Sequence, residues 1–203
     1  VNGQVERSPQ MLPVELVNHQ RAAILALAGI HAKDQMETAA ILSQVHHEDE
    51  GVREAAITAL GNKEGTGVVP ALLGALRDPY RQVKLAAIRS LAIRVDSRAV
   101  LPLVELLKTT STMKPREARR FREPVFEALA AMEDQAVAAP LLELLNQENR
   151  YIREGAKQRL VKMKDPAAAG KVLEKLEPSD GPMKSTIIWL LGQLRYKPAT
   201  GPL

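Results

Sequence analysis

Two columns of apolar residues recur along the 203-residue chain, and each repeats mainly every 31 residues. The first column has spacings of 31, 38, 31 and 31 and consists of Leu60, Leu91, Leu129, Leu160 and Leu191. The second has spacings of 31, 31, 38 and 31 and consists of Val45, Leu76, Leu107, Leu145 and Leu176. Because both columns report the same unit and the same single interruption, the chain is predicted to be an array of two-helix repeats.

The residues that precede the first column form one face of a helix. Apolar or small residues precede most of these leucines by 3, 4 and 8 positions, as Ile57, Ala56 and Val52 do in the first unit. Small side chains four positions before the leucine predict that neighbouring helices approach closely. Gly61 and Gly192 follow their leucines at positions expected of helix C-caps.

The pattern predicts an all-α fold, a right-handed α-solenoid of about five helix pairs with an additional capping helix at the N-terminus. Second helices are expected near residues 51–61, 80–92, 118–131, 149–161 and 182–194. Complete repeats are expected near residues 35–61, 68–92, 98–131, 135–161 and 166–194. Residues 1–17 are expected to be a lead-in or cap, and residues 18–203 a single repeat domain.

Residues 49–61 (DEGVREAAITALG) and 69–79 (VPALLGALRDP) resemble HEAT repeats. The period of 31 residues is similar to the short subtype named after the phycobilisome lyases, and the resemblance covers about residues 18–194. It implies a stacked helical fold. Similar proteins include chromophore lyase subunits, an iron hydroxylase, DNA glycosylases of related build and many scaffolds, so function has to be argued from the sites.

Metal chemistry is disfavoured by the residues in the repeats. The HEAT-repeat iron hydroxylase uses His-Glu pairs, and the matching positions here read Arg53-Glu54, Lys84-Leu85, Arg122-Glu123 and Arg153-Glu154. The run His46-His47-Glu48-Asp49-Glu50 has metal-ligating residue types, but adjacent side chains point in different directions. We interpret this run as a solvated turn and predict no metal and no cofactor.

Composition excludes several other classes of protein. The chain has no cysteine, which excludes disulfides, thiolate catalysis and cysteine zinc sites. No run approaches the roughly 18 apolar residues that span a bilayer, so we expect a soluble protein without a membrane span. Because the first residue is Val1, we expect a cut domain or a mature product. A cytoplasmic location is favoured slightly, a lost export signal remains open, and the oligomeric state is undetermined.

Positive charge gathers in the middle of the chain. Residues 77–123 hold 12 basic and 5 acidic side chains, whereas residues 1–76 hold 5 basic and 9 acidic ones. The basic region includes the interruption of the repeat, where seven extra residues fall in a polar segment, residues 108–116, expected to be a flexible turn. The candidate partner-binding residues are the central cations and one later equivalent, namely Arg81, Lys84, Arg89, Lys114, Arg116, Arg119, Arg120 and Arg150.

Two sets of basic residues recur once per repeat. The basic ladder, seven positions before the leucine column, consists of Arg53, Lys84, Arg122, Arg153 and Lys184, and we interpret it as structural. Ten positions before their leucines lie Arg81, Arg119 and Arg150, which we expect to begin second helices and to form a stripe along one edge of the array. A cation is unfavourable at a helix N-terminus, so recognition explains these arginines better than local stability does.

These features favour a non-enzymatic protein-interaction scaffold that binds an acidic or extended protein partner. The first alternative is nucleic-acid binding, in which the central cations neutralise phosphates, although six aromatic residues leave little for base stacking. The second alternative is a lyase-like or chaperone subunit, for which repeat length is the only argument.

Overall fold

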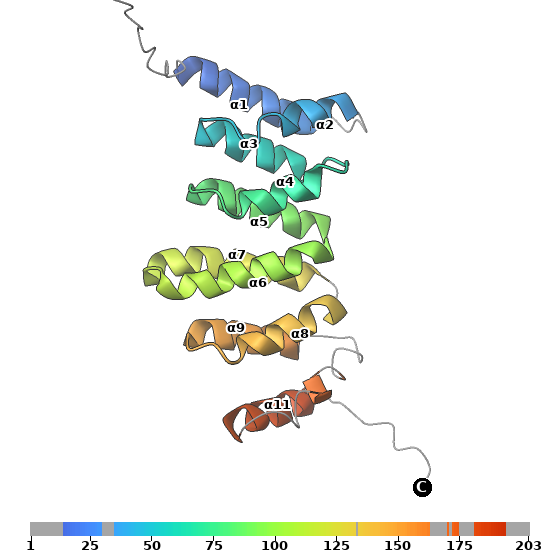
Figure 1. The fold of residues 1–203 in the computed structure, drawn as a ribbon, viewed down its shortest axis with the longest axis vertical. Helices are drawn as coiled ribbons and strands as arrows, with labels where there is room; N and C mark the ends of the chain where they lie inside the picture. Colours follow the sequence, from blue (N-terminus) through green and yellow to red (C-terminus); the bar gives the residue numbers. More distant parts are fainter. Residues whose placement is uncertain are drawn as a thin grey trace, which may run out of the picture.

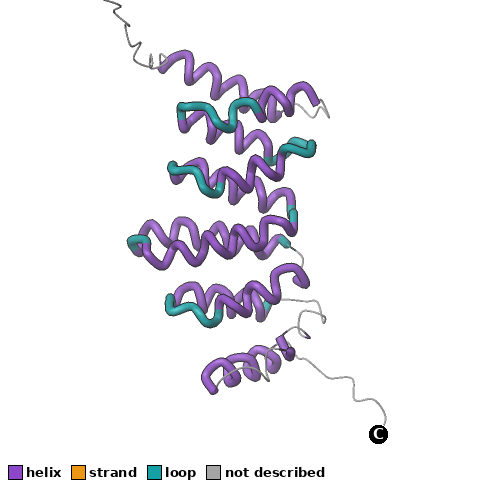
Figure 2. Tube along the Cα trace, viewed as in Figure 1, coloured by secondary structure: helices purple, strands orange, loops and turns teal. Residues whose placement is uncertain are grey.

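The computed structural model describes residues 14–29, 35–132, 134–162, 170, 172–174 and 181–193. In this part of the chain every regular element is a helix (Figure 2). The α-helices are α1 (Val14–Gly29), α2 (Gln35–Leu42), α3 (Glu50–Leu60), α4 (Val68–Ala75), α5 (Arg81–Arg94), α6 (Val100–Thr109), α7 (Pro115–Ala131), α8 (Asp134–Leu144), α9 (Arg150–Val161) and α11 (Gly181–Gln193). Two short 3-10 helices, Ser97–Ala99 and Thr110–Thr112, flank α6.

The helices stack into an elongated array in which each layer contacts the next (Figure 1). The second helices form one row, in which α1 packs on α3, α3 on α5, α5 on α7, α7 on α9, and α9 on α11. The first helices lie beside this row, as α4 packs on α5, α6 on α7 and α8 on α9. The predicted helical solenoid is therefore confirmed. No helix among the described residues is long and apolar enough to cross a membrane.

Several boundaries differ from the sequence-based expectation. The N-terminal helix α1 begins at Val14, inside the segment expected to be a lead-in. Of the first helix expected in the last pair, only residues 170 and 172–174 are described. Among the side chains of α11 that the structure describes, Ile187 and Leu190 are covered almost completely, whereas Ile188 is 56% exposed. The contact face of this last helix is therefore turned by one residue from the column that ends at Leu191.

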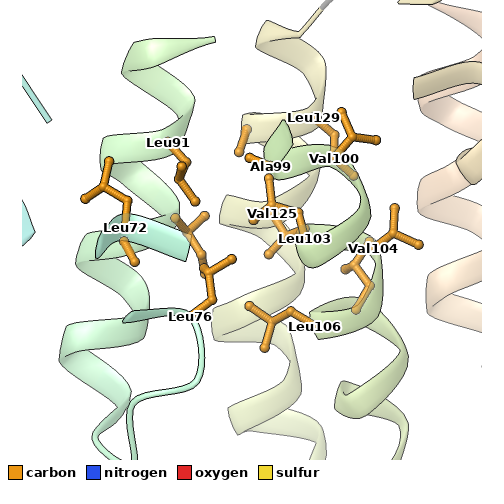
Figure 3. Close-up of a cluster of buried hydrophobic side chains, with 14 of the residues drawn as sticks. Leu72, Leu76, Leu91, Ala99, Val100, Leu103, Val104, Leu106, Val125 and Leu129 are labelled. Atoms are coloured by element: carbon orange, nitrogen blue, oxygen red, sulfur yellow. The ribbon is translucent and has the colours of Figure 1, made fainter. Parts of the chain in front are cut away.

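The core follows the two apolar columns. Leu60, Leu91, Leu129 and Leu160 have no exposed surface. Figure 3 shows Leu72 of α4 near Leu91 of α5, Leu103 of α6 beside Val125 of α7, and Val100 of α6 beside Leu129 of α7. Leu91 and Leu129 thus each pack against residues of their own first helix.

Successive second helices approach closely at small residues. The Ser90 hydroxyl on α5 donates a 3.0 Å hydrogen bond to the carbonyl oxygen of Ile57 on α3. A Cβ atom on Gly61 would lie 2.9 Å from that hydroxyl. Gly61 is the C-cap of α3, as predicted, but its backbone angles are right-handed, so close approach explains this glycine better than a left-handed conformation does. Gly192 lies within α11, and the C-cap prediction is wrong there.

The insertion is mostly helical, which corrects the prediction of a flexible turn. The hydroxyls of Thr109, Thr110 and Thr112 each donate to a carbonyl three residues earlier, at 2.7, 2.6 and 3.0 Å. These bonds continue α6 into a 3-10 turn, and Pro115 is preorganised for the first turn of α7. As a result α7 has 17 residues, compared with 11 in α3.

Stability should depend on where a leucine lies in the stack. Leu91→Ala should lower the free energy of unfolding by about 2 to 5 kcal/mol, because it leaves a cavity in the middle of the array. Leu190→Ala should mainly fray α11 and shift the main thermal transition much less. Circular-dichroism melting of both variants checks this, and equal shifts would contradict stability that passes from layer to layer.

Candidate binding groove between α7 and α9

Side-chain size changes at the contact between α7 and α9. One position before the leucine column, the second helices carry Ala59, Ser90 and Ala128, but α9 carries Arg159. Three positions before the column, α3 and α5 carry isoleucines, but α7 carries Phe126. Larger side chains therefore lie at this contact than at the contacts of α3 with α5 and of α5 with α7.

The space between these helices is a cavity of about 730 Å³, which we call the α7–α9 groove. Its lining from α7 spans residues 115–130, which corresponds to about 22 Å of helix at 1.5 Å per residue. That length accommodates roughly six or seven residues of extended chain. The lining consists of Pro115, Arg116, Arg119, Arg122, Glu123, Phe126, Glu127, Ala130, Tyr151, Glu154, Gly155, Gln158, Arg159 and Lys162.

Two aromatic rings form apolar parts of this groove. Phe126 lies directly against Gly155, where an added Cβ atom would be 2.3 Å from the ring. Tyr151, in the first turn of α9, is 71% exposed. The groove therefore offers apolar contacts beside its charged groups, a combination found in sites that bind peptides and small molecules.

The charged lining comprises five basic and three acidic side chains. Arg119 donates a 2.9 Å hydrogen bond to Glu123, which raises the pKa of Arg119. Both side chains are exposed, so this pair constrains the groove little. The Arg159 guanidinium donates to the carbonyl oxygens of Leu129 and Met132 at 3.3 and 3.4 Å, and so holds α9 to the end of α7.

Arg122 is the most enclosed cation on the N-terminal side of the groove, with 8% of its surface exposed. Its Nη1 donates to Oδ1 of Asn149 at 3.3 Å, and its guanidinium lies 5.0 Å from the centre of the Tyr151 ring. Burial lowers the pKa of Arg122, and its buried Nε has no hydrogen-bond acceptor among the described residues.

The basic ladder behaves as predicted at two of its positions. Arg53 donates to both carboxylate oxygens of Asp78, at 2.8 and 3.2 Å, and this hydrogen bonding raises the pKa of Arg53. Its Nη1 also donates to the carbonyl oxygens of residues 47 and 48. Arg153 donates to the matching carbonyls of residues 147 and 148. The structural interpretation is confirmed for Arg53 and Arg153.

The predicted partner-binding residues fall into two groups. Arg116 and Arg119 line the groove. The others are not among its lining residues: Arg81, Lys84 and Arg89 lie on α5, Lys114 is the N-cap of α7, Arg120 lies on α7 and Arg150 on α9.

The expected common position of three of these arginines is only partly correct. Arg81 and Arg150 are the first residues of α5 and α9. Arg119 is the fifth residue of α7, because the insertion extends this helix back to Pro115. The helix-dipole argument for a recognition role therefore does not apply to Arg119.

Sequence reasoning missed Phe126, Tyr151, Arg159 and Lys162 as groove residues. Two signals were present in the sequence: Arg159 interrupts a column of small residues, and Gly155 lies inside a helix, where glycine is unfavourable unless space requires it.

The histidine-rich run is part of a helix N-terminus. The Asp49 side chain accepts hydrogen bonds from the backbone N–H groups of Gly51 and Val52, and so caps α3. Nδ1 of His47 accepts from the Asp49 N–H at 3.0 Å. Within the described residues, no three His, Asp or Glu side chains are arranged to hold a metal ion.

Substitution of Gly155 should disturb the groove. Gly155→Ala places a methyl group against the Phe126 ring, so we expect a loss of about 1 kcal/mol or more in the free energy of unfolding. Gly74→Ala is the matched control, because nothing lies within 4 Å of that position and alanine is the better helix former. Urea denaturation compares them, and equal or higher stability of Gly155→Ala would contradict the close packing.

Comparison with known proteins agrees with this architecture. A search of curated proteins found no match. A solved structure of the complex of CpcE and CpcF of phycocyanin lyase from Nostoc sp. PCC7120 is 21% identical, with 97% of this chain and 82% of that chain covered and a TM-score of 0.56. An engineered protein is 20% identical, with 88% and 91% covered and a TM-score of 0.52.

These likenesses describe the fold alone. The family model for HEAT repeats matches residues 15–92 and 38–120, which together make up just over half of the chain. The array of helix pairs, the leucine columns that recur along it and this match lead to one conclusion: the chain belongs to the HEAT-repeat family.

Proposed function

We propose that this chain is a non-enzymatic interaction scaffold that holds an extended, acidic segment of a partner protein in the α7–α9 groove. The observation that carries the proposal is the groove itself, with its volume of about 730 Å³ between two long helices. A cavity of this size and length suits a stretch of polypeptide better than a compact metabolite.

The chemistry of the groove supports an acidic occupant. Arg116 and Arg119 are exposed and precede Arg122, the α7 residue that contacts the N-cap of α9, so they are available to attract carboxylates. Phe126 and Tyr151 provide apolar surface for the side chains between those carboxylates. Electrostatic attraction then sets the rate and direction of binding, and apolar contact adds affinity.

Nucleic acid suits the same groove less well. Glu123, Glu127 and Glu154 lie among the lining residues, where they would repel a regular series of phosphates. A polypeptide carries backbone N–H groups as well as acidic side chains, so it can satisfy carboxylates and guanidinium groups together. A lyase-like or chaperone role has only the likeness of fold in its favour.

Fluorescence anisotropy with synthetic probes tests the proposal. A labelled peptide of about eight residues, alternating glutamate and alanine, should bind and should weaken as salt increases. Arg116→Glu combined with Arg119→Glu should weaken binding about tenfold or more, while helicity stays unchanged because both side chains are exposed. Arg81→Glu combined with Arg89→Glu reverses the same amount of charge outside the groove and should change affinity by less than about threefold.

The other outcomes separate the rival hypotheses. Equal weakening by both double variants would favour the broad central stripe expected from the sequence over the groove. Tighter binding of a short DNA duplex than of the acidic peptide would favour the nucleic-acid hypothesis. Absence of binding to either probe would reject the proposal for acidic partners.

A further inference from the structure

Two arginines occupy the same repeat position in similar surroundings. Arg53 and Arg122 each lie seven residues before a column leucine, and both are largely buried. The Arg53 guanidinium lies 5.2 Å from the Tyr80 ring centre, and that of Arg122 lies 5.0 Å from the Tyr151 ring centre. The two sites therefore share a guanidinium that reaches the next repeat and stacks on a tyrosine.

The sites differ in the residue two positions before the tyrosine. At the first site this residue is Asp78, whose carboxylate forms a buried ion pair with Arg53. Oδ1 of Asp78 also accepts the N–H of Tyr80 at 2.8 Å. At the second site the residue is Asn149, whose Oδ1 accepts the N–H of Tyr151 at 3.0 Å and Nη1 of Arg122. The turn geometry is kept, but the negative charge is absent.

This difference leaves a largely buried positive charge that no carboxylate pairs with in the described part of the chain. A buried charge without a counterion is unfavourable for stability. An arginine is therefore poorly explained here as a structural residue, in contrast to Arg53. Arg122 also lines the groove, whereas Arg53, the equivalent residue on α3, does not.

We propose that Arg122, Asn149 and Tyr151 form a receptor for one carboxylate of the bound partner. This inference rests on the proposed function and specifies which group of the acidic segment is recognised. The incoming carboxylate lies beside Asn149, supplies the negative charge that Asp78 supplies to Arg53, and accepts guanidinium N–H groups not engaged by Asn149. Because Oδ1 of Asn149 is used as an acceptor, its amide N–H₂ is left to donate to the same carboxylate.

A stability comparison tests whether Arg122 lacks an internal partner. Arg53→Met breaks an ion pair and leaves Asp78 buried and unpaired, so its melting temperature should fall by roughly 5 °C or more. Arg122→Met removes an uncompensated charge and keeps similar volume, so its melting temperature should stay within about 2 °C of the parent or rise. An equally large fall for Arg122→Met would show that the residue is structural and would overturn the proposal.

A binding comparison tests the receptor with the glutamate-alanine peptide. Arg122→Met should weaken binding about tenfold or more, because a charge-assisted hydrogen bond is lost. Asn149→Asp should weaken it similarly by supplying an internal carboxylate. Asp78→Asn, which removes a carboxylate outside the groove, should not weaken it. Aspartate at position 149 also improves the helix cap, whether or not Arg122 is present. The change in melting temperature caused by Asn149→Asp is therefore measured both in the parent and in Arg122→Met.

Peptide variants identify the carboxylate and separate the two levels of proposal. Amidation of the peptide C-terminus removes the terminal carboxylate, and replacement of single glutamates by glutamine removes side-chain ones. One of these changes should weaken binding to the parent and have little effect on Arg122→Met. If the peptide binds the parent, Arg122→Met and Asn149→Asp equally, the scaffold function stands and the receptor is rejected. If Asn149→Asp is stabilising only when Arg122 is present but no peptide binds, the acidic-partner function is rejected and Arg122 lacks only an internal counterion.

Discussion

The close approach of successive second helices is the contact on which the other features depend. Ala56 and Ala87 are fully buried, and Ser90 bonds directly to a backbone carbonyl of the preceding layer. Side chains this small let the helix backbones come together, so the leucine columns can be covered from both sides. Each layer has apolar faces that a neighbouring layer must cover, so the array is stable only as a stack.

Guanidinium groups join successive layers through hydrogen bonds to backbone carbonyls. Arg94 donates to the carbonyl oxygen of Lys63, and Arg159 donates to that of Met132, three residues after the leucine in each preceding second helix. These carbonyls lie beyond the ends of α3 and α7, where backbone acceptors lack helical partners. Directional bonds at helix ends fix how far one layer slides along the next, which apolar contact alone leaves loosely determined.

The helix pairs could be predicted because their cause is periodic. Burial of the leucine columns requires one face per helix, and a recurring face is visible in a single sequence. The end of the array was harder, because α11 turns its contact face to Ile187 and Leu190. The helical conformation of the insertion was also not predicted, because the composition of this segment is typical of a flexible turn. Three threonine hydroxyls donate to backbone carbonyls there and continue the helix.

The groove could not be predicted from any periodic pattern, because it results from departures from the repeat. Phe126 and Arg159 replace the usual residue types of their columns, and Gly155 leaves room for the Phe126 ring. Their combined effect depends on side-chain geometry across two helices. Arg53 has a carboxylate partner and Arg122 has none, because residue 78 is an aspartate and residue 149 an asparagine. These residues lie 25 and 27 positions beyond the two arginines. Sequence reasoning identified both arginines as members of one ladder and had no means to separate their roles.

A stacked fold explains why such a departure is tolerated at one layer. The contact of α3 with α5 is made by helices that contribute no residue to the groove, so changes between α7 and α9 leave the first layers intact. A compact domain with one shared core would transmit the same disturbance throughout its packing. In the stack, the cost of larger side chains at one helix contact, and of a buried cation without a carboxylate partner, is confined to that interface. The repeat architecture thus lets the contact between a single pair of helices differ from the others while the remaining layers maintain the fold.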